Sequence, residues 1–312
     1  MAENRAASRG MTLAAFAAVY VIWGSTYLAI RYAIESLPSF LMASARFMLA
    51  GAVLYAFMRW RGAPAPSRRH WISSLRIGAL LLLVGNGAVV WAEHRIPSGI
   101  AALLVAVEPL WIVVLDWARR GGKRPAGRTL VGVVLGFVGL LILVGPDATS
   151  GTAPVDLLGA GVVVVGALAW AVGSLYSRHA PIPESPFLAT AMQMLSGGAL
   201  LLVAGVVTGE AAALDPSAFT GRSLAALAYL TVFGSLVAFT AYTWLLGVVS
   251  PARASTYAYV NPLVAVMLGW ALANEALTAR VAVSAVVIVA AVALITSVGE
   301  AVKESMPEGA PA

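Results

Sequence analysis

The sequence contains no cysteine, and only 11% of its 312 residues are charged. Without cysteine, the chain has no disulfides, no thiolate metal ligands and no cysteine nucleophile. A soluble domain carries about 25% charged residues, because water must solvate its surface. This chain has too little charge to cover a water-facing globule of its size. That shortage excludes an ordinary soluble enzyme, a nucleic-acid-binding protein and a disordered protein.

Apolar residues make up 60% of the sequence, and the mean hydropathy is +0.88. They gather in continuous runs rather than alternating with polar residues, which favours helices over barrel strands. Because a helix needs about 20 apolar residues to cross a bilayer, these runs predict an all-α integral membrane protein. The ten predicted spans are residues 11–33, 38–60, 72–92, 97–118, 128–146, 157–178, 186–208, 223–249, 251–273 and 278–298.

The positive charges lie almost entirely in the short segments between the runs, and cytoplasmic segments are the ones enriched in Lys and Arg. With the N-terminus inside, the cytoplasmic segments hold Arg5, Arg9, Arg59, Arg61, Arg68, Arg69, Arg119, Arg120, Lys123, Arg124, Arg128, Arg178, Arg253 and Lys303. The outer segments hold Arg95, Arg222 and Arg280. We therefore expect both short tails, residues 1–10 and 299–312, to be cytoplasmic.

The two halves of the sequence resemble each other. The aligned pairs are Trp23 with Trp170, Leu28 with Leu175, Arg31 with Arg178, Trp91 with Trp244, Pro109 with Pro262, and Trp117 with Trp270. We predict two five-helix repeats, residues 11–146 and 157–298. An odd number of spans makes the second copy enter the membrane upside down, and inverted repeats are typical of secondary transporters.

A proline follows a polar residue inside the fourth and ninth runs, as Glu108-Pro109 and Asn261-Pro262. A proline inside a helix removes one backbone hydrogen bond to the carbonyl four residues earlier, here that of Val105 or Ala258. Lipid cannot satisfy such a carbonyl, so each site must face protein or a wet cavity. We predict helix breaks at both prolines.

Glu108 is the only acidic residue at mid-membrane depth in the ten runs. A charged side chain there costs about 2.5–3.5 kcal/mol, so it must be paired, protonated or exposed to water. Arg46, near the middle of the second run, is its natural partner by depth. Two interpretations stay open: an ion pair that holds two helices together, or a carboxylate that binds the ammonium of a substrate or couples transport to protons.

Aromatic residues recur within the runs at helical spacing. Trp23, Trp111 and Trp170 lie in mid-run, and Tyr20, Trp23 and Tyr27 share one helix face. Such stripes are more often packing than binding, but hydroxyl and amide groups such as those of Asn86, Tyr257 and Asn261 need partners away from water. A cavity with aromatic walls and a few polar groups suits an amphipathic metabolite, particularly a large neutral amino acid.

The stretch Trp23-Gly-Ser-Thr, the pair Arg46-Phe47 and the prolines within the fourth and ninth runs give the sequence a family resemblance. Over residues 11–298 it resembles the drug/metabolite transporter (DMT) superfamily, in particular its EamA-type members and most nearly the YddG-type aromatic amino-acid exporters. The resemblance implies export of amino acids or related metabolites from a bacterial cytoplasm. We expect the protein to be a monomer in the inner membrane and to need no cofactor.

The resemblance also implies that helices 1, 3, 4, 6, 8 and 9 surround a central cavity and that helices 5 and 10 are peripheral. The cavity residues it implies are Trp23, Asn86, Glu108, Trp170, Tyr242, Tyr257 and Asn261. Together with the sequence pattern above, which adds Tyr27 and Trp111, these form the candidate substrate site.

Other functions fit less well. A phosphorylated substrate calls for cations facing the cavity, and the last three runs have none in their interior. An exporter of cationic drugs stays open, because one acid and several aromatics also suit an organic cation. An intramembrane protease is disfavoured, since His70, His94 and His179 are peripheral and Asp116 is alone. Proton coupling and facilitated diffusion both remain possible.

Overall fold

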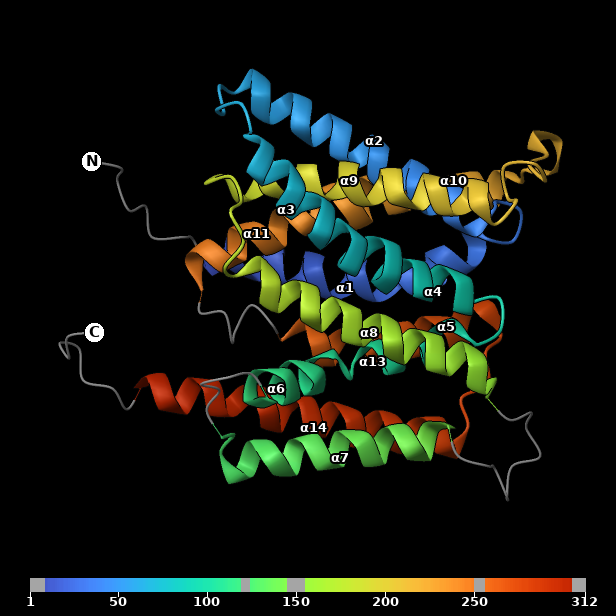
Figure 1. Ribbon diagram of the computed structural model, residues 1–312. Helices are drawn as coiled ribbons and strands as arrows, with labels where there is room; N and C mark the ends of the chain where they lie inside the picture. Colours follow the sequence, from blue (N-terminus) through green and yellow to red (C-terminus); the bar gives the residue numbers. More distant parts are fainter. Residues whose placement is uncertain (1–8, 119–123, 145–154, 250–255, 305–312) are drawn as a thin grey trace, which may run out of the picture.

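The computed structural model describes residues 9–118, 124–144, 155–249 and 256–304, and over these ranges it contains helices and no strands (Figure 1). Eight described helical segments are long and apolar enough to cross a membrane, and the shorter apolar helices Val260–Ala273 and Ala279–Ile295 follow them. The all-helical membrane architecture is therefore confirmed. The sidedness remains a prediction, and several residues on which it depends lie outside the described ranges: Arg5, Arg119, Arg120, Lys123 and Arg253.

The first half of the chain begins with two unbroken helices and continues with two interrupted ones. Its elements are α1 (Arg9–Ala33), α2 (Ser39–Trp60), α3 (Arg68–Gly78), the π-helix η1 (Ala79–Asn86), α4 (Gly87–Ala92), α5 (Ser98–Val105), α6 (Glu108–Ala118) and α7 (Gly127–Val144). The elements α3, η1 and α4 follow one another without a gap, whereas α5 and α6 are separated by two residues.

The second half repeats much of this order. Its elements are α8 (Leu157–Ser177), α9 (Pro186–Val207), the 3-10 helix η2 (Pro216–Ala218), α10 (Gly221–Tyr229), the π-helix η3 (Leu230–Val237), α11 (Ala238–Val248), α13 (Tyr257–Ala273) and α14 (Ala279–Glu304). A π-helix again interrupts the third long segment, between α10 and α11.

Side-chain caps define several helix starts in the polar connections. Ser67 and His70 form a capping box at the start of α3, and Asp156 accepts a hydrogen bond from the Gly159 amide at the start of α8. Ser185 caps α9, where Pro186 occupies the first turn. These residues satisfy amide groups that a helix leaves unpaired at its first turn, so the short connections end one helix and begin the next.

Helices from the two halves pack against each other throughout the bundle. α2 packs on α9, α1 contacts α10, α11 and α13, and α8 contacts η1, α4, α5 and α6. In Figure 1, α7 and α14 lie side by side along one edge, on the side of the bundle opposite α2. This arrangement leaves the faces of α1, η1, α8 and α13 to meet at the centre.

Glycines on one face of α7 allow α14 to approach closely. A Cβ atom added at Gly132 would lie 2.8 Å from Cγ1 of Ile295, and one added at Gly139 would lie 2.8 Å from Cγ1 of Ile288. The absence of side chains at these positions lets the two helices pack along their length, as small residues do in membrane interfaces.

Replacing Gly132 by leucine should therefore destabilise the pair α7–α14 by about 1–3 kcal/mol, because the new side chain overpacks the contact. A lower midpoint of thermal unfolding in detergent would show the effect. Gly161→Leu is the matched control, since a Cβ atom at this mid-helix glycine of α8 has no neighbour within 4 Å. Equal midpoints for the two variants would contradict the assignment.

Candidate functional site

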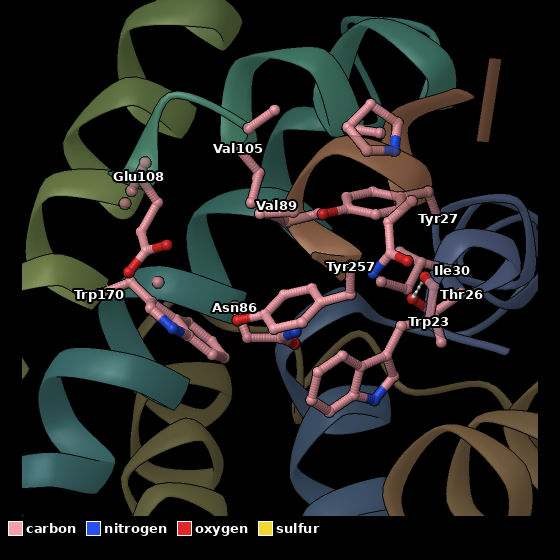
Figure 2. A pocket seen from close by; sticks show the side chains of 18 of the residues that line it. Trp23, Thr26, Tyr27, Ile30, Asn86, Val89, Val105, Glu108, Trp170 and Tyr257 are labelled. Atoms are coloured by element: carbon pink, nitrogen blue, oxygen red, sulfur yellow. Dashed lines mark hydrogen bonds between the residues drawn. The ribbon is translucent and has the colours of Figure 1, made fainter. Parts of the chain in front are cut away.

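A cavity of about 150 Å³ lies where α1, η1, α8 and α13 meet, and most of the residues proposed from the sequence line it (Figure 2). The lining residues among them are Trp23, Tyr27, Arg46, Asn86, Glu108, Pro109, Trp170, Tyr257, Asn261 and Pro262. In Figure 2, Glu108 and Trp170 lie on one side, and Trp23, Tyr27 and Tyr257 lie on the other. The walls are thus aromatic, with amide and charged groups set between the rings.

Trp23 is held by its own ring contacts and one hydrogen bond. Its Nε1 donates to the backbone oxygen of Gly234 at 3.1 Å, and its ring lies 5.0 Å from that of Tyr257 and 5.2 Å from that of Tyr242, centroid to centroid. Tyr242 is not among the lining residues, which corrects its assignment to the cavity wall. It supports the lining rings of Trp23 and Tyr257 instead.

Trp170, the counterpart of Trp23 in the second half, packs on the other π-helix. A Cβ atom at Gly85 of η1 would lie 2.9 Å from Cε3 of Trp170, so this position has no room for a side chain. Each tryptophan therefore lies against a glycine within a π-helix of the opposite half: Trp23 against Gly234 and Trp170 against Gly85.

The two π-helices were not predicted from the sequence. π-helical turns are rare and occur frequently at functional sites. The runs Ala79–Asn86 and Leu230–Val237 are apolar and contain no proline, so their composition matches that of an ordinary α-helix. Each run contains one glycine, but the α-helices α7, α8 and α9 contain glycines too, so this residue does not distinguish the π-helices.

The helix is interrupted at residues 106–107, so Pro109 lies in the first turn of the helix that follows. α5 ends at Val105 and α6 begins at Glu108, so this carboxylate belongs to the first residue of a new helix and projects into the cavity (Figure 2). Pro109 has no N–H to offer the carbonyl of Val105, and Val105 itself lines the cavity. The break thus places the Glu108 carboxylate and the end of α5 at the same cavity.

The expected break at Pro262 is absent, and this prediction was wrong. α13 runs from Tyr257 to Ala273 through Pro262, which lies in the second turn of the helix. So close to the helix start, proline removes only the bond to Ala258, and the remaining turns continue beyond it. Ala258 and Asn261 both line the cavity, so the region still presents polar groups there.

Arg46 and Glu108 are not ion-paired in the described part of the chain, contrary to one of the two interpretations. The Arg46 side chain turns toward η3, where its Nε donates to Oγ of Ser235 at 2.9 Å, and its guanidinium lies 4.7 Å from the Phe47 ring centroid. Arg46 is only 4% exposed. Both charged residues line the cavity, so a positive and a negative group face it separately.

Trp111 lies outside the cavity, which corrects its place among the candidate residues. Its ring packs edge-on against Phe137 of α7, with the centroids 5.2 Å apart. It belongs to the apolar cluster that joins α6 to α7 and α14. Its position in mid-run indicated burial in the bundle but not the direction in which the ring points.

Polar contacts join the ends of α1 and α13 to the start of α5, next to the cavity-lining residue Ile30. Oε1 of Glu275 accepts hydrogen bonds from the Ser98 amide at 2.7 Å and from its hydroxyl at 2.8 Å, and Oε2 accepts one from the Gly99 amide at 3.0 Å. Nε of Arg31 lies 3.8 Å from the same carboxylate. We call Arg31, Ser98, Gly99 and Glu275 the junction.

A left-handed turn positions Glu275 at the junction. Asn274 has a φ of 54° and ends α13, after which the chain turns and Glu275 points at the first turn of α5. A carboxylate is stabilised there by the free amides and the positive end of the helix. The hydroxyl of Tyr32 also donates to the carbonyl of Leu272 at 2.7 Å, which joins the ends of α1 and α13 directly.

Comparison with known proteins agrees with this architecture. The model of the EamA-like transporter family matches residues 9–145 and again residues 157–297. The chain is 41% identical to the uncharacterized inner membrane transporter YedA of Escherichia coli K12 over 280 residues, covering 89% of this chain and 88% of that one. It is 24% identical to the protein PecM of Dickeya dadantii, covering 89% of each chain.

A plant protein and a solved structure extend the likeness. The WAT1-related chloroplastic protein At3g02690 of Arabidopsis thaliana is 27% identical, covering 88% of this chain and 67% of that one. One crystal structure of a protein matches with a TM-score of 0.59 at 23% identity, covering 94% of this chain and 99% of that one, which shows the fold alone. With the apolar helices, the likeness to YedA places the chain in the inner membrane.

Proposed function

This chain belongs to the EamA-like transporter family, and we propose that it exports amino acids, aromatic and other neutral ones among them, by alternating access through the central cavity. The observation that carries this proposal is the separation of Arg46 and Glu108 in a cavity walled by aromatic rings. A zwitterion with a large side chain matches all three features. Its carboxylate pairs with Arg46, its ammonium with Glu108, and its side chain lies among the rings.

The energetic reason is the low dielectric of the site. Buried charges without partners are costly, so two opposite charges that do not reach each other favour a ligand that brings the complementary pair. Aromatic walls add apolar contact with the side chain and cation–π attraction with the ammonium. A substrate with only one charge leaves either Arg46 or Glu108 without a partner.

The proposed mechanism uses ten spans in two inverted five-helix repeats, residues 11–146 and 157–298. The reciprocal packing of helices supports it, since α2 packs on its counterpart α9 and α7 on its counterpart α14. The contacts Trp23–Gly234 and Trp170–Gly85 are also reciprocal, since each joins a tryptophan of one half to a π-helix glycine of the other half. Near-symmetric halves allow one to rock against the other around a fixed central site.

Sidedness follows from the excess of cations in alternate connections, which puts both tails in the cytoplasm. The junction of Arg31 and Glu275 then lies at the outer end of the cavity. On this sidedness, we propose that the contacts of the junction close the outer end, which is the state in which a transporter loads cytoplasmic substrate. Export as the direction of net transport rests on the resemblance to amino-acid exporters.

Counterflow in proteoliposomes tests the substrate class. Vesicles loaded with unlabelled tryptophan should accumulate labelled tryptophan from outside, and threonine should compete more weakly because its side chain covers less of the aromatic wall. A quaternary methylammonium compound should not compete, because it leaves Arg46 unpaired. Accumulation of the quaternary amine without that of tryptophan would instead support a cationic-drug exporter and reject the amino-acid proposal.

A further inference from the structure

Glu93 is a buried acid that plays no part in the substrate site described above. It follows the last residue of α4, one helical turn beyond Val89, which lines the cavity. Only 1% of Glu93 is exposed, and neither carboxylate oxygen has a hydrogen-bond partner within the described residues. A buried carboxylate without partners is strongly disfavoured in its ionised form.

The neighbouring cation is already engaged elsewhere. Nη1 of Arg31 donates to the backbone oxygen of Glu93 at 3.1 Å rather than to its carboxylate, and Nε of Arg31 lies near the carboxylate of Glu275. The Glu93 carboxyl is repelled by the charge of Glu275 and attracted by that of Arg31. The junction and the adjoining Glu93 together therefore hold two carboxylates and one guanidinium, which leaves one negative charge without compensation unless a proton is bound.

The other charged or titratable groups around α4 have partners of their own. Arg95 pairs with Asp156 at the start of α8, the His94 ring bonds to Ser39 of α2, and Glu210 accepts from the first amides of α2. Burial lowers the pKa of His94. On the cavity side the titratable neighbour is Tyr27 of α1. Its hydroxyl lies within electrostatic range of both the Glu93 and the Glu108 carboxyl groups.

We propose that Glu93 is a proton-binding site, and that a proton must occupy it before the junction of α1, α5 and α13 can close. Closure places Glu93 in a dry environment while Arg31 turns to Glu275. In the open form, water reaches Glu93, and Arg31 is released from Glu275 to face either carboxylate. The neutral acid therefore favours the closed junction, and the carboxylate favours the open one.

This proposal rests on the alternating access proposed above and gives that cycle a driving ion. With the outer end open, substrate leaves and one proton from outside binds Glu93. The junction then closes around the neutral acid, and the proton leaves to the cytoplasm through the cavity, past Tyr27. The carboxylate left behind is disfavoured in the closed form and drives reopening after cytoplasmic substrate has bound. One proton thus enters for each substrate molecule exported.

The absence of cysteine from the sequence makes the opening of the junction directly measurable. Ile30, which precedes Arg31, lines the cavity and is 2% exposed, so Ile30→Cys places a single thiol behind the junction. A membrane-impermeant maleimide added outside intact cells reacts with this thiol only while the outer end is open. The rate is measured below and above neutral pH in the parent and in a chain that also carries Glu93→Gln.

At each pH, the labelling rate of the parent, which carries Ile30→Cys alone, is divided by the rate of the chain that also carries Glu93→Gln. This ratio removes the pH dependence of the thiol reaction itself, because both chains carry the same cysteine. We expect this ratio to rise with pH by roughly tenfold per unit over the titration of Glu93. Glu93→Leu, a second uncharged variant, should behave like Glu93→Gln. His94→Gln should keep the pH dependence of the parent, which separates Glu93 from the nearby imidazole.

A ratio that does not change with pH, or loss of the pH dependence in His94→Gln, would overturn the proposal. Labelling needs no substrate, so it can be compared with counterflow of tryptophan by the same chains. A pH-dependent ratio without tryptophan counterflow would support the proton site while rejecting the substrate class. Tryptophan counterflow with a constant ratio would support the substrate class and reject the proton site.

Discussion

Replacing Glu108 by glutamine should reduce the rate of tryptophan counterflow by at least about tenfold while the amount of protein in the membrane stays unchanged. The carboxylate faces the cavity and has no ion pair or hydrogen bond to another described residue. Under the proposed function, its loss therefore removes an interaction with the substrate rather than one that holds helices together. Glutamine keeps the size and the position of the side chain but cannot pair with an ammonium group.

A matched control and a matched ligand make this result specific. Glu35 is an acid on the protein surface that pairs with Arg222 and takes no part in the cavity, so Glu35→Gln should leave counterflow unchanged. Indole-3-propionate lacks the amino group of tryptophan and leaves Glu108 without a partner, so it should compete weakly in the parent and more strongly in Glu108→Gln, where that unpaired charge is removed. Full tryptophan counterflow by Glu108→Gln would show that Glu108 does not bind the substrate amine.

Much of the lining of the cavity could be predicted because membrane burial makes certain residues costly. Glu108, Asn261 and the tryptophans Trp23 and Trp170 were identified because polar or aromatic groups at mid-depth need partners that lipid cannot supply. The same argument predicts the depth of a residue in the membrane but not the direction in which its side chain points. Trp111 is at the right depth, but its ring points to Phe137 rather than into the cavity.

The errors have the same origin. Depth alone suggested that Arg46 pairs with Glu108, but the rotation of α2 brings the guanidinium to Ser235, a residue that gave no signal in the sequence. The break at Pro262 depended on where α13 begins, and boundaries of helices are poorly determined by sequence patterns. A proline in the second turn is tolerated, whereas Pro109 follows a real interruption.

Contacts between distant segments were beyond the reach of the sequence. Asn274 ends α13 in the left-handed conformation, and Glu275 follows it. The carboxylate of Glu275, however, binds the first turn of α5, which is far away in the sequence, and no local pattern reveals that target. The π-helices were equally hidden, since an extra residue in a turn leaves an apolar run unchanged in composition.

Replacing Glu275 by alanine should increase external labelling of the Ile30→Cys thiol by about a hundredfold, because the outer end loses the contacts that keep it closed. The carboxylate accepts three hydrogen bonds from Ser98 and Gly99 and lies beside Arg31. Hydrogen bonds to a charged group contribute about 1.5–3 kcal/mol each, and about 1.4 kcal/mol is a tenfold change in equilibrium. Even partial replacement by water leaves a shift of this size.

Glu210→Ala is the matched control, because the two acids are built alike. Glu210 also accepts hydrogen bonds from two amides at the start of a helix, those of Phe40 and Leu41 in α2, but it contacts none of the junction residues. Its loss should lower thermal stability without raising the labelling rate. If both variants labelled equally fast, helix capping in general, rather than the junction, would control access. If neither did, the outer end would be closed by the apolar packing of α1 against α13, and Glu275 would act only as the cap of α5.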